Sequence, residues 1–362
     1  MKRSFSDSGQ SVLIAMSGGV DSTAAALKLL ESGYTLIGCT FVTRYTLPAS
    51  IEAAQALAAQ LGIEHHVVDY SEMFESTIVD YFISEYEAGR TPNPCVLCNR
   101  LIKFGALVKE ADRLGCDFIA TGHYARLSNS SFIRVAADVA KDQSYFLWQV
   151  EPTVLERVLF PLGDMTKTEV REYLAQKGFE SLSKQGESQD ICFIPNDYRT
   201  FLRERLRDKY KEYMSFTIGQ RKGLGVALGY PAFVTCIGGK EDRCKEDRNK
   251  EEMSKGVGVE HPNVPGVYLG HHDDLYAMEV QLRDVIFRGD PNQPVMAKIR
   301  YRSPATEAIL QRSDPSAQRS FSEAVFQQSG RLSFTQPVWA PTPGQSCVFY
   351  QSNLVVGGGV IV

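Results

Sequence analysis

The sequence predicts an α/β protein: a parallel-sheet domain, then a small central domain, then a β-barrel-like domain at the C-terminus. The first ~125 residues alternate short apolar runs with helical patterns, as in a parallel sheet covered by helices on both faces. From about Val267 the chain is rich in strands of alternating polarity, which predicts a small closed β domain. A chain of 362 residues also exceeds what one compact core usually holds. We therefore expect domains at 1–200, 201–270 and 271–362.

Four strands and four helices make up the predicted N-terminal sheet domain. The first helix is amphipathic, the second is rich in alanine, and three of the helices stop at Gly33, Gly62 and Gly115. Sheets of this kind bind ligands beyond the carboxyl ends of their strands, where the strand order reverses. The strands are expected over Val12–Met16, Thr35–Phe41, His65–Val68 and Phe118–Thr121, and the helices over Asp21–Glu31, Ser50–Leu61, Ser71–Ala88 and Leu101–Leu114.

Further along the chain the pattern changes to hairpins and isolated helices. Ala125–Val150 is typical of a hairpin, with a polar turn at Asn129–Ser131. A helix is expected to open at Thr166, because TKTE is a capping box in which the threonine caps the helix and Glu169 reaches back. The charged run at 240–256 has almost no apolar residues, which favours a disordered surface insertion over a functional arm.

Composition excludes some classes of protein. The net charge of −4 excludes a uniformly basic nucleic-acid-binding surface, although not a local basic patch. The first residues lack the apolar core of a signal peptide and no apolar run is long enough to span a membrane, so we expect a cytoplasmic protein. Eight cysteines in a reducing compartment argue against a disulfide scaffold. Four of them are expected to be small buried hydrophobes: Cys39, Cys116, Cys236 and Cys347.

The stretch SGGVDS, Ser17–Ser22, follows the first strand and opens the first helix. Two glycines let the backbone approach an anion, and the amides at the helix N-terminus point at it. Asp21 would repel a phosphate unless a cation intervened, so Mg²⁺ is implied. The stretch lacks the lysine of a Walker A loop. The alternative is an ordinary glycine turn between a strand and a helix.

The stretch TPNPCVLCNR, Thr91–Arg100, places Cys95 and Cys98 three residues apart behind prolines. This spacing suits a metal clamp, a redox pair, or one sulfur carrier beside a bystander. The residues alone do not decide among these three readings.

SGGVDS resembles the PP-loop signature of the ATP pyrophosphatases, an adenine nucleotide alpha hydrolase-like fold. Further stretches narrow the resemblance to the bacterial tRNA-specific 2-thiouridylase family, which places sulfur on C2 of the wobble uridine. They run in the family's order from the first strand to the C-terminus: AGRTPNPCVLCNRLIKF (Ala88–Phe104), ATGHYAR (Ala120–Arg126), KDQSYFLW (Lys141–Trp148), PLGDMTKTEVRE (Pro161–Glu172), ESQDICFI (Glu187–Ile194), TIGQRKGLG (Thr217–Gly225), KIRYRSP (Lys298–Pro304) and PGQSCVFY (Pro343–Tyr350).

The resemblance implies a reaction and a set of site residues. ATP·Mg²⁺ would adenylate O2 of uridine 34, and sulfur carried as a persulfide would reach C2, with Cys98 and Cys192 as the catalytic thiols. The base would be flipped out of its stack against Asn93, Pro94 and Cys95. ATP would contact Ala15, Met16, Ser17, Gly18, Gly19, Val20, Asp21, Ser22, Phe41 and Gly122, and tRNA would contact His123, Lys141, Asp142, Gln143, Tyr301, Arg302 and Gln345.

Several of these residues also have structural readings. His123 suits a satisfied structural histidine, Lys141–Gln143 a turn, and the RYR stretch a solvated strand face. GQRKGLG, Gly219–Gly225, places two cations between glycines; a basic loop on RNA phosphate is favoured over a solvated turn. The implied partners are tRNAs of the Lys, Glu and Gln type and a cysteine desulfurase or sulfur relay protein.

Two departures from the family bear on the chemistry. Cys95 occupies a position where relatives usually carry an aspartate, so the role of that carboxylate is in doubt. Cys95, Cys98 and Cys192 would also suffice to ligate a [4Fe–4S] cluster with one open iron; a metal-free persulfide pair and a zinc site are the alternatives. A glycine-rich stretch of the family is missing, and Arg203–Ser215 bridges its place, which shortens the central domain.

Two rival functions are also compatible with parts of the sequence. A PP-loop synthetase acting on a small molecule would need neither the cysteine pair nor the C-terminal β domain. A non-catalytic nucleotide-binding module would have lost the chemistry, and the presence of SGGVDS, Cys98 and Cys192 argues against it.

Overall fold

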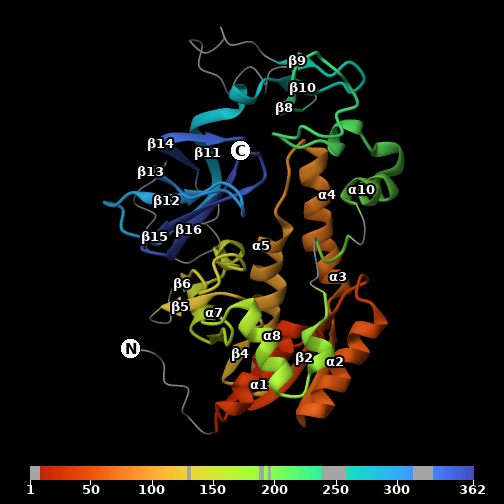
Figure 1. Ribbon diagram of the computed structural model, residues 1–362, viewed down its shortest axis with the longest axis vertical. Coiled ribbons are helices and arrows are strands. Elements are labelled where there is room, and N and C mark those ends of the chain that lie inside the picture. The colour runs from red at the N-terminus through yellow and green to blue at the C-terminus, as the bar shows by residue number, and fades with distance from the viewer. Residues whose placement is uncertain (1–8, 129–131, 187–190, 195–196, 239–257, 313–328) are drawn as a thin grey trace. The chain divides into compact units, whose positions relative to one another are not determined.

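The computed structural model describes residues 9–128, 132–186, 191–194, 197–238, 258–312 and 329–362 (Figure 1). The chain divides into two compact units. Unit 1 consists of residues 1–79, 94–193 and 352–356; unit 2 consists of 80–93, 194–351 and 357–362. The division into three domains at 200 and 270 stays a prediction.

Unit 1 contains a five-stranded parallel sheet of order β3-β2-β1-β4-β7. Residues of β1 pair with β2 on one side and β4 on the other, so that Val12 lies opposite both Leu36 and Phe118. The four expected strands are confirmed, and the short strand β7 is additional. The strands are β1 (Ser11–Ala15), β2 (Thr35–Val42), β3 (Glu64–Asp69), β4 (Phe118–Ala120) and β7 (Val158–Leu159).

One face of this sheet is covered by α1 (Val20–Glu31), α2 (Pro48–Leu61) and α8 (Lys167–Gln176). Val12 and Ile14 point into that core, because alternate residues of a strand share a face. Leu13 is buried on the other side, against which α6 (Leu107–Leu114) packs. Alanines on α1 and α2 keep these helices close to the strands. Thr166 caps α8 with both bonds of the expected capping box.

Two long helical segments contain π-helical turns, which the sequence pattern did not predict. The segment from Ser71 is α3 (Ser71–Phe74), a π turn (Glu75–Val79) and α4 (Asp80–Glu87). The next helix begins at Pro94, seven residues before the predicted start at Leu101. It consists of α5 (Pro94–Cys98), a π turn (Asn99–Ala106) and α6. Cys95 and Cys98 therefore lie on a helix. Proline fits the first helical position because it needs no amide donor there.

The remaining elements of unit 1 are short. The predicted hairpin is formed by β5 (Arg126–Ser128) and β6 (Phe132–Arg134), and its turn lies outside the described residues. Leu354 of the segment 352–356 pairs with Arg134 on β6. The other helices are a 3₁₀ turn (Ser144–Leu147), α7 (Pro152–Leu155) and α9 (Glu180–Ser183).

Unit 2 contains a closed antiparallel barrel, as expected for the C-terminal part. Its strands follow the order β11-β14-β13-β12-β15-β16, and pairing of β16 with β11 closes the ring. A side chain at Gly357 would collide with the carbonyl of Ile286, so a glycine is needed where these strands meet. The strands are β11 (Tyr276–Phe287), β12 (Val295–Lys298), β13 (Thr306–Arg312), β14 (Gly330–Trp339), β15 (Ser346–Gln351) and β16 (Leu354–Ile361).

The rest of unit 2 is a small subdomain with its own apolar core. Phe216, Val234 and Leu269 are among the buried residues of that core. The charged run 240–256 lies outside the described residues. The elements are α10 (Tyr198–Leu206), 3₁₀ turns (Arg207–Lys209, Glu212–Ser215, His272–Leu275) and a three-stranded sheet of β8 (Phe233–Ile237), β10 (Val267–Gly270) and β9 (Val259–Glu260).

Two expectations about composition have mixed outcomes. Cys39, Cys116 and Cys347 are buried, as predicted. Cys236 is half-buried and disulfide-bonded, so the prediction of a buried free thiol is wrong there. Within the part of the chain that the structure describes, no helix has the length and apolarity needed to cross a membrane.

Candidate active site

The Ser17–Ser22 loop lies between β1 and α1, as predicted. Gly18 has a left-handed φ of +72°, and a Cβ there would lie 3.0 Å from both the Ala53 Cβ and the Ala54 amide nitrogen. Gly19 is the N-cap of α1 and supplies no side chain. The first amides of a helix have no partner within it and carry partial positive charge. The loop therefore presents its backbone to an anion.

Two serines shape this loop in different ways. Ser22 is buried, and its hydroxyl donates to the Gly19 carbonyl at 3.1 Å. It also lies 3.3 Å from the Ser17 hydroxyl, and the Ser17 amide donates to it. Ser17 is exposed. Ser22 thus holds the turn, while Ser17 is accessible to a ligand.

Gly122 lies where β4 ends and closes against the same loop. A Cβ at Gly122 would be 2.9 Å from the Asp21 carbonyl carbon and 3.0 Å from the Ser22 nitrogen. β1 and β4 are neighbours, and the chain reaches β2 and β4 on opposite sides of β1. This is the point of reversed strand order at which open α/β sheets bind ligands. The close approach of Gly122 to the backbone of Asp21 and Ser22 explains why a glycine is required at position 122.

Asp21 has two partners that the sequence reasoning missed. Lys167 Nζ lies 2.7 and 2.8 Å from its two carboxylate oxygens, and the Tyr124 hydroxyl donates to it at 2.8 Å. The sequence implied a cation beside Asp21, and the described side chain that supplies one is Lys167. One sequence feature could have drawn attention to Lys167. The capping box makes Thr166 the N-cap, so Lys167 is the first residue of the helix.

The other residues expected near ATP lie around the ends of β1 and β2. Met16 is buried, and its amide donates to the Cys39 carbonyl at 2.8 Å. Phe41 is half-buried, with its ring edge-on to Tyr70 at 4.9 Å. Ala15 is the last residue of β1. Their contacts with a nucleotide stay predictions.

Three cysteines of unit 1 differ in accessibility. Cys98 is 7% exposed, Cys95 is half-buried and Cys192 is exposed. Phe193, next to Cys192, packs edge-on against Phe74 with ring centroids 5.6 Å apart. That contact anchors the end of the segment carrying Cys192.

The thiols share one electrostatic environment. Burial raises the pKa of Cys98 to about 12, and desolvation by surrounding protein atoms also raises the pKa of Cys95 and of Cys192, even though Cys192 is exposed. The charge of Lys103 acts in the other direction and lowers the pKa of all three. A thiolate on Cys192 would raise the pKa of the other two thiols further. The three thiols thus lie within electrostatic range of Lys103, the cation that favours their thiolate forms.

The metal alternatives receive no support from the geometry. Among the residues that the structure describes, no three His, Cys, Asp or Glu side chains are arranged to share a metal ion. In the described residues the three thiols are therefore not arranged to share a single metal ion such as zinc, and no observation supports a [4Fe–4S] cluster there. Mg²⁺ is a different case, since it commonly enters with substrate phosphates and one or two carboxylates. Asp21 is a suitable carboxylate at the loop.

Residues of unit 1 that were expected to touch tRNA are largely engaged within the protein. His123 is 8% exposed, shares a hydrogen bond with Thr121 at 2.8 Å and packs on Phe104. Burial, with the nearby Lys103 charge, lowers its pKa well below the usual value, so it is neutral. Asp142 is buried and accepts from the Ala136 amide, while Gln143 accepts from the Tyr124 amide at 2.9 Å. Lys141 is half-buried. Their contacts with RNA stay predictions.

Unit 2 carries the other expected tRNA contacts and Asn93. Arg302 is exposed and Tyr301 is half-buried, both in the turn after β12. Gln345 donates to the carbonyls of Thr91 at 2.9 Å and Pro92 at 3.2 Å. It therefore holds the segment that leads to Asn93, which sequence reasoning did not foresee.

A phosphate-binding loop at the switch point of a parallel sheet, followed by a β-barrel, defines a nucleotide-binding α/β protein of the PP-loop class. Residues 10–196 match the model of the tRNA methyl transferase HUP domain, and residues 279–361 match the aminomethyltransferase beta-barrel domain. The chain belongs to the tRNA-specific 2-thiouridylase family, as the following relatives show.

Three relatives match along almost the whole chain. The tRNA-specific 2-thiouridylase MnmA 3 of Bacteroides fragilis is 40% identical over 98% of this chain and 95% of its own. The MnmA proteins of Cytophaga hutchinsonii and Desulfitobacterium hafniense are 37% and 36% identical, each over 97% of this chain, and over 96% and 98% of their own. A solved 4-thiouridine synthetase–RNA complex with bound ATP is 18% identical, with a TM-score of 0.37 over 56% of this chain and 51% of that chain; so low a score carries no argument.

Proposed function

We propose that this protein is a tRNA-uridine 2-sulfurtransferase that uses ATP to convert the wobble uridine to 2-thiouridine. Relatives named tRNA-specific 2-thiouridylase match over nearly its full length. The observation that carries the proposal is that two features occur in the same unit. One is the phosphate loop with Lys167 bound to Asp21, and the other is the group of thiols under the influence of Lys103. A small-molecule synthetase would have no use for those thiols.

The first step is adenylation of O2 of the uridine. The loop amides and Ser17 bind the ATP phosphates, with Phe41 beside the adenine and Gly122 closing the loop. Asp21 would hold Mg²⁺ together with the phosphates, and the ion would supply positive charge that neutralises them. Lys167, now paired with Asp21, can turn its ammonium toward the charge that develops as pyrophosphate leaves. The product is a uridine whose C2 carries AMP as a leaving group.

The second step transfers sulfur. Cys192 carries it as a persulfide, which suits the exposed thiol of the three. The terminal sulfur attacks C2, the C2–O bond breaks, and AMP leaves with the bonding electrons. The thiolate of Cys98 then attacks the inner sulfur of Cys192, forming a Cys98–Cys192 disulfide and leaving C2=S on the base. A thiol reductant restores both cysteines before the next turnover.

Positions of the base and of the sulfur source complete the proposal. Asn93, Pro94 and Cys95 line the pocket of the flipped uracil, where the Cys95 thiol replaces the usual carboxylate. His123, Lys141–Gln143, Tyr301, Arg302 and Gln345 lie along the path of tRNA. A cysteine desulfurase, directly or through a relay protein, supplies the persulfide sulfur. The [4Fe–4S] route is not adopted, because nothing in the described residues supports a cluster.

The test is thiolation of unmodified tRNA carrying uridine 34, with ATP, a cysteine desulfurase and cysteine, followed by mass spectrometry of the nucleosides. Wild-type protein should form 2-thiouridine and one AMP for each. Cys98→Ala and Cys192→Ser should abolish the product, whereas Cys116→Ala, at a buried cysteine outside the cluster, should not. ATP cleavage that needs no tRNA would instead favour a small-molecule synthetase.

A further inference from the structure

We propose that a cationic hollow in unit 2 binds backbone phosphates of the RNA substrate. The hollow has a volume of about 400 Å³ and is lined by Arg199, Arg221, Lys222 and Arg300, together with the polar Gln220 and Tyr198. No acidic side chain lines it among the described residues. The chain as a whole carries a net charge of −4, so this local concentration of cations stands out as a site for a polyanion.

Two of the four cations are fixed in place by backbone oxygens. Arg300 donates to the carbonyls of Ile218 and Ala340, both at 2.9 Å, and to the Thr342 hydroxyl. Arg199 Nε donates to the Ser215 carbonyl at 2.9 Å. Such anchored guanidinium groups lose little freedom when an anion arrives, and the planar guanidinium group matches phosphate geometry.

Asp197 lies close to one of these cations, with its Oδ1 3.9 Å from Arg199 Nη1. Both side chains are more than a third exposed, so this pair contributes little and leaves the positive charge of the hollow in excess.

The other two cations lie on a glycine-bounded loop. Arg221 and Lys222 are exposed, and neither forms an ion pair with any residue that the structure describes. Gly219 and Gly223 flank them with φ of +81° and +71°. The Gly219 amide donates to the Val234 carbonyl at 2.8 Å, which ties the start of the loop to β8. The loop is thus held at its base while its two cations face solvent.

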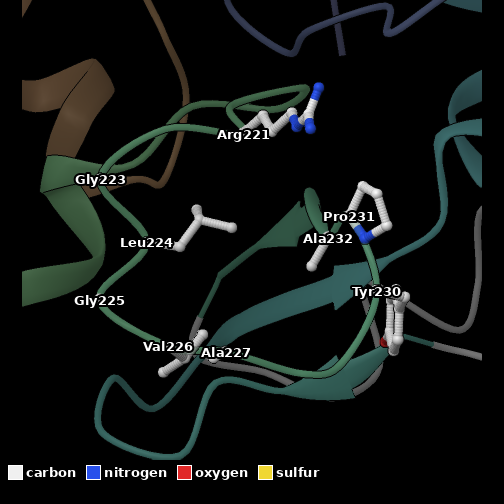
Figure 2. Close-up of a pocket in the computed structure, with 9 residues that line it drawn as sticks. All are labelled: Arg221, Gly223, Leu224, Gly225, Val226, Ala227, Tyr230, Pro231 and Ala232. Atoms are coloured by element: carbon white, nitrogen blue, oxygen red, sulfur yellow. The ribbon is translucent and has the colours of Figure 1, made fainter.

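A second hollow borders the first at Arg221 (Figure 2). The chain from Gly223 to Ala232 runs around it, and Leu224, Val226 and Tyr230 line it. Tyr230 stacks on His271, with ring centroids 4.3 Å apart. Cations close to an aromatic ring, here Tyr230, are typical of surfaces that follow an RNA backbone and accept its bases. This arrangement favours RNA over a free phosphate compound.

The inference rests on the proposed function, because it takes tRNA as the substrate. Arg221→Gln/Lys222→Gln is compared with a control, Lys209→Gln/Lys211→Gln, which removes the same charge from exposed positions outside the hollow. Binding of unmodified tRNA is measured by fluorescence anisotropy from 50 to 300 mM KCl. The first variant should bind about tenfold more weakly at 100 mM KCl, and the slope of log Kd against log [KCl] should fall by about 1 to 2. Its thiolation KM for tRNA should rise at unchanged kcat.

Each outcome decides one point. If wild-type protein neither binds nor thiolates tRNA, the proposed function fails and this inference with it. If wild-type thiolates tRNA but the Arg221/Lys222 variant matches the control in Kd and slope, only the inference is overturned. Titration with pyrophosphate alone separates the two sources of phosphate. If the Arg221/Lys222 variant loses pyrophosphate binding but binds tRNA as the wild-type protein does, the inference is also overturned.

Discussion

Lys167 Nζ lies 2.7 Å from Asp21 Oδ1, although the two residues are 146 positions apart in the chain. Tyr124 donates to the same oxygen, and Lys167 also lies over the Tyr124 ring, 5.7 Å from its centroid. The lysine is mostly buried, with 13% of its side chain exposed. The Lys167 ammonium is therefore held at the phosphate loop by Asp21, the same carboxylate that would otherwise repel phosphate.

Replacing Lys167 by glutamine should remove the positive charge beside Asp21 at the phosphate loop. We expect the rate of tRNA-dependent AMP formation to fall by about 100-fold or more, as when one preorganised donor is removed from an active site. The control is Lys177→Gln near the end of the same helix, where Lys177 pairs with Glu31. Single-turnover kinetics with saturating ATP measures the effect. Equal rates in both variants would contradict the role of Lys167.

Gly122→Ala should disturb the nucleotide loop directly. The new Cβ would lie 2.9 Å from the Asp21 carbonyl carbon, a backbone atom that cannot move without shifting α1. We expect weaker ATP binding and a loss of about 1–3 kcal/mol in the free energy of unfolding, as for other overpacked sites. Gly186→Ala is the control, since a Cβ there meets no atom within 4 Å. Urea unfolding and ATP titration by calorimetry measure both effects.

Gln345→Ala should loosen the segment before Asn93. Gln345 donates to the Thr91 and Pro92 carbonyls, and the Thr91 amide donates to Pro343 at 2.8 Å. Loss of two hydrogen bonds should cost about 1–3 kcal/mol of unfolding free energy. The kcat for thiolation should fall while ATP binding is unchanged. Gln281→Ala, on the exposed side of β11, should change neither quantity. An unchanged kcat in Gln345→Ala would contradict a positioning role for Gln345 and leave only its expected contact with tRNA.

The parallel sheet was predictable because its signals are local. The strands β1 to β4 are apolar runs bounded by helices, and Gly62 and Gly115 end α2 and α6 with left-handed φ, as the sequence pattern indicated. β7 has only two residues, too few for any periodicity. The π turns also went unpredicted, because an apolar stripe does not distinguish i+5 from i+4 bonding.

The site was predictable where it is continuous in the chain. Ser17–Ser22 lies on one turn, and its geometry follows from the glycines and the helix start. The Asp21–Lys167 pair and the Gln345–Thr91 hydrogen bond join segments that are distant in the chain, so no local sequence pattern predicts them. The helical start at Pro94 had a readable signal, proline at a first helical position, which the apolar periodicity from Leu101 outweighed.

Alkylation should distinguish the thiols of the free protein. With a pKa of about 12, Cys98 has a thiolate fraction of about 10⁻⁴ at pH 8, and it is also buried. Cys192 is exposed, so iodoacetamide should modify it first. Cys39, buried and with a pKa likewise raised to about 12, serves as an internal reference for slow reaction. Peptide mass spectrometry over time measures the order. Modification of Cys98 before Cys192 would reverse the assigned roles.

Lys103→Met should shift the reactivity of Cys192 toward higher pH. The lysine charge lowers the pKa of Cys192, so its removal raises that pKa, and less thiolate is present at each pH below it. The rate of alkylation between pH 7 and 9 should therefore fall severalfold in 50 mM salt. The difference should narrow in 1 M salt, because Lys103 is exposed and its field is screened there. Lys109→Met, another exposed lysine further along the same helical segment, should leave the pH profile of Cys192 where it is in wild-type protein. A profile for Lys103→Met that coincides with that of Lys109→Met would show that Lys103 does not support the Cys192 thiolate.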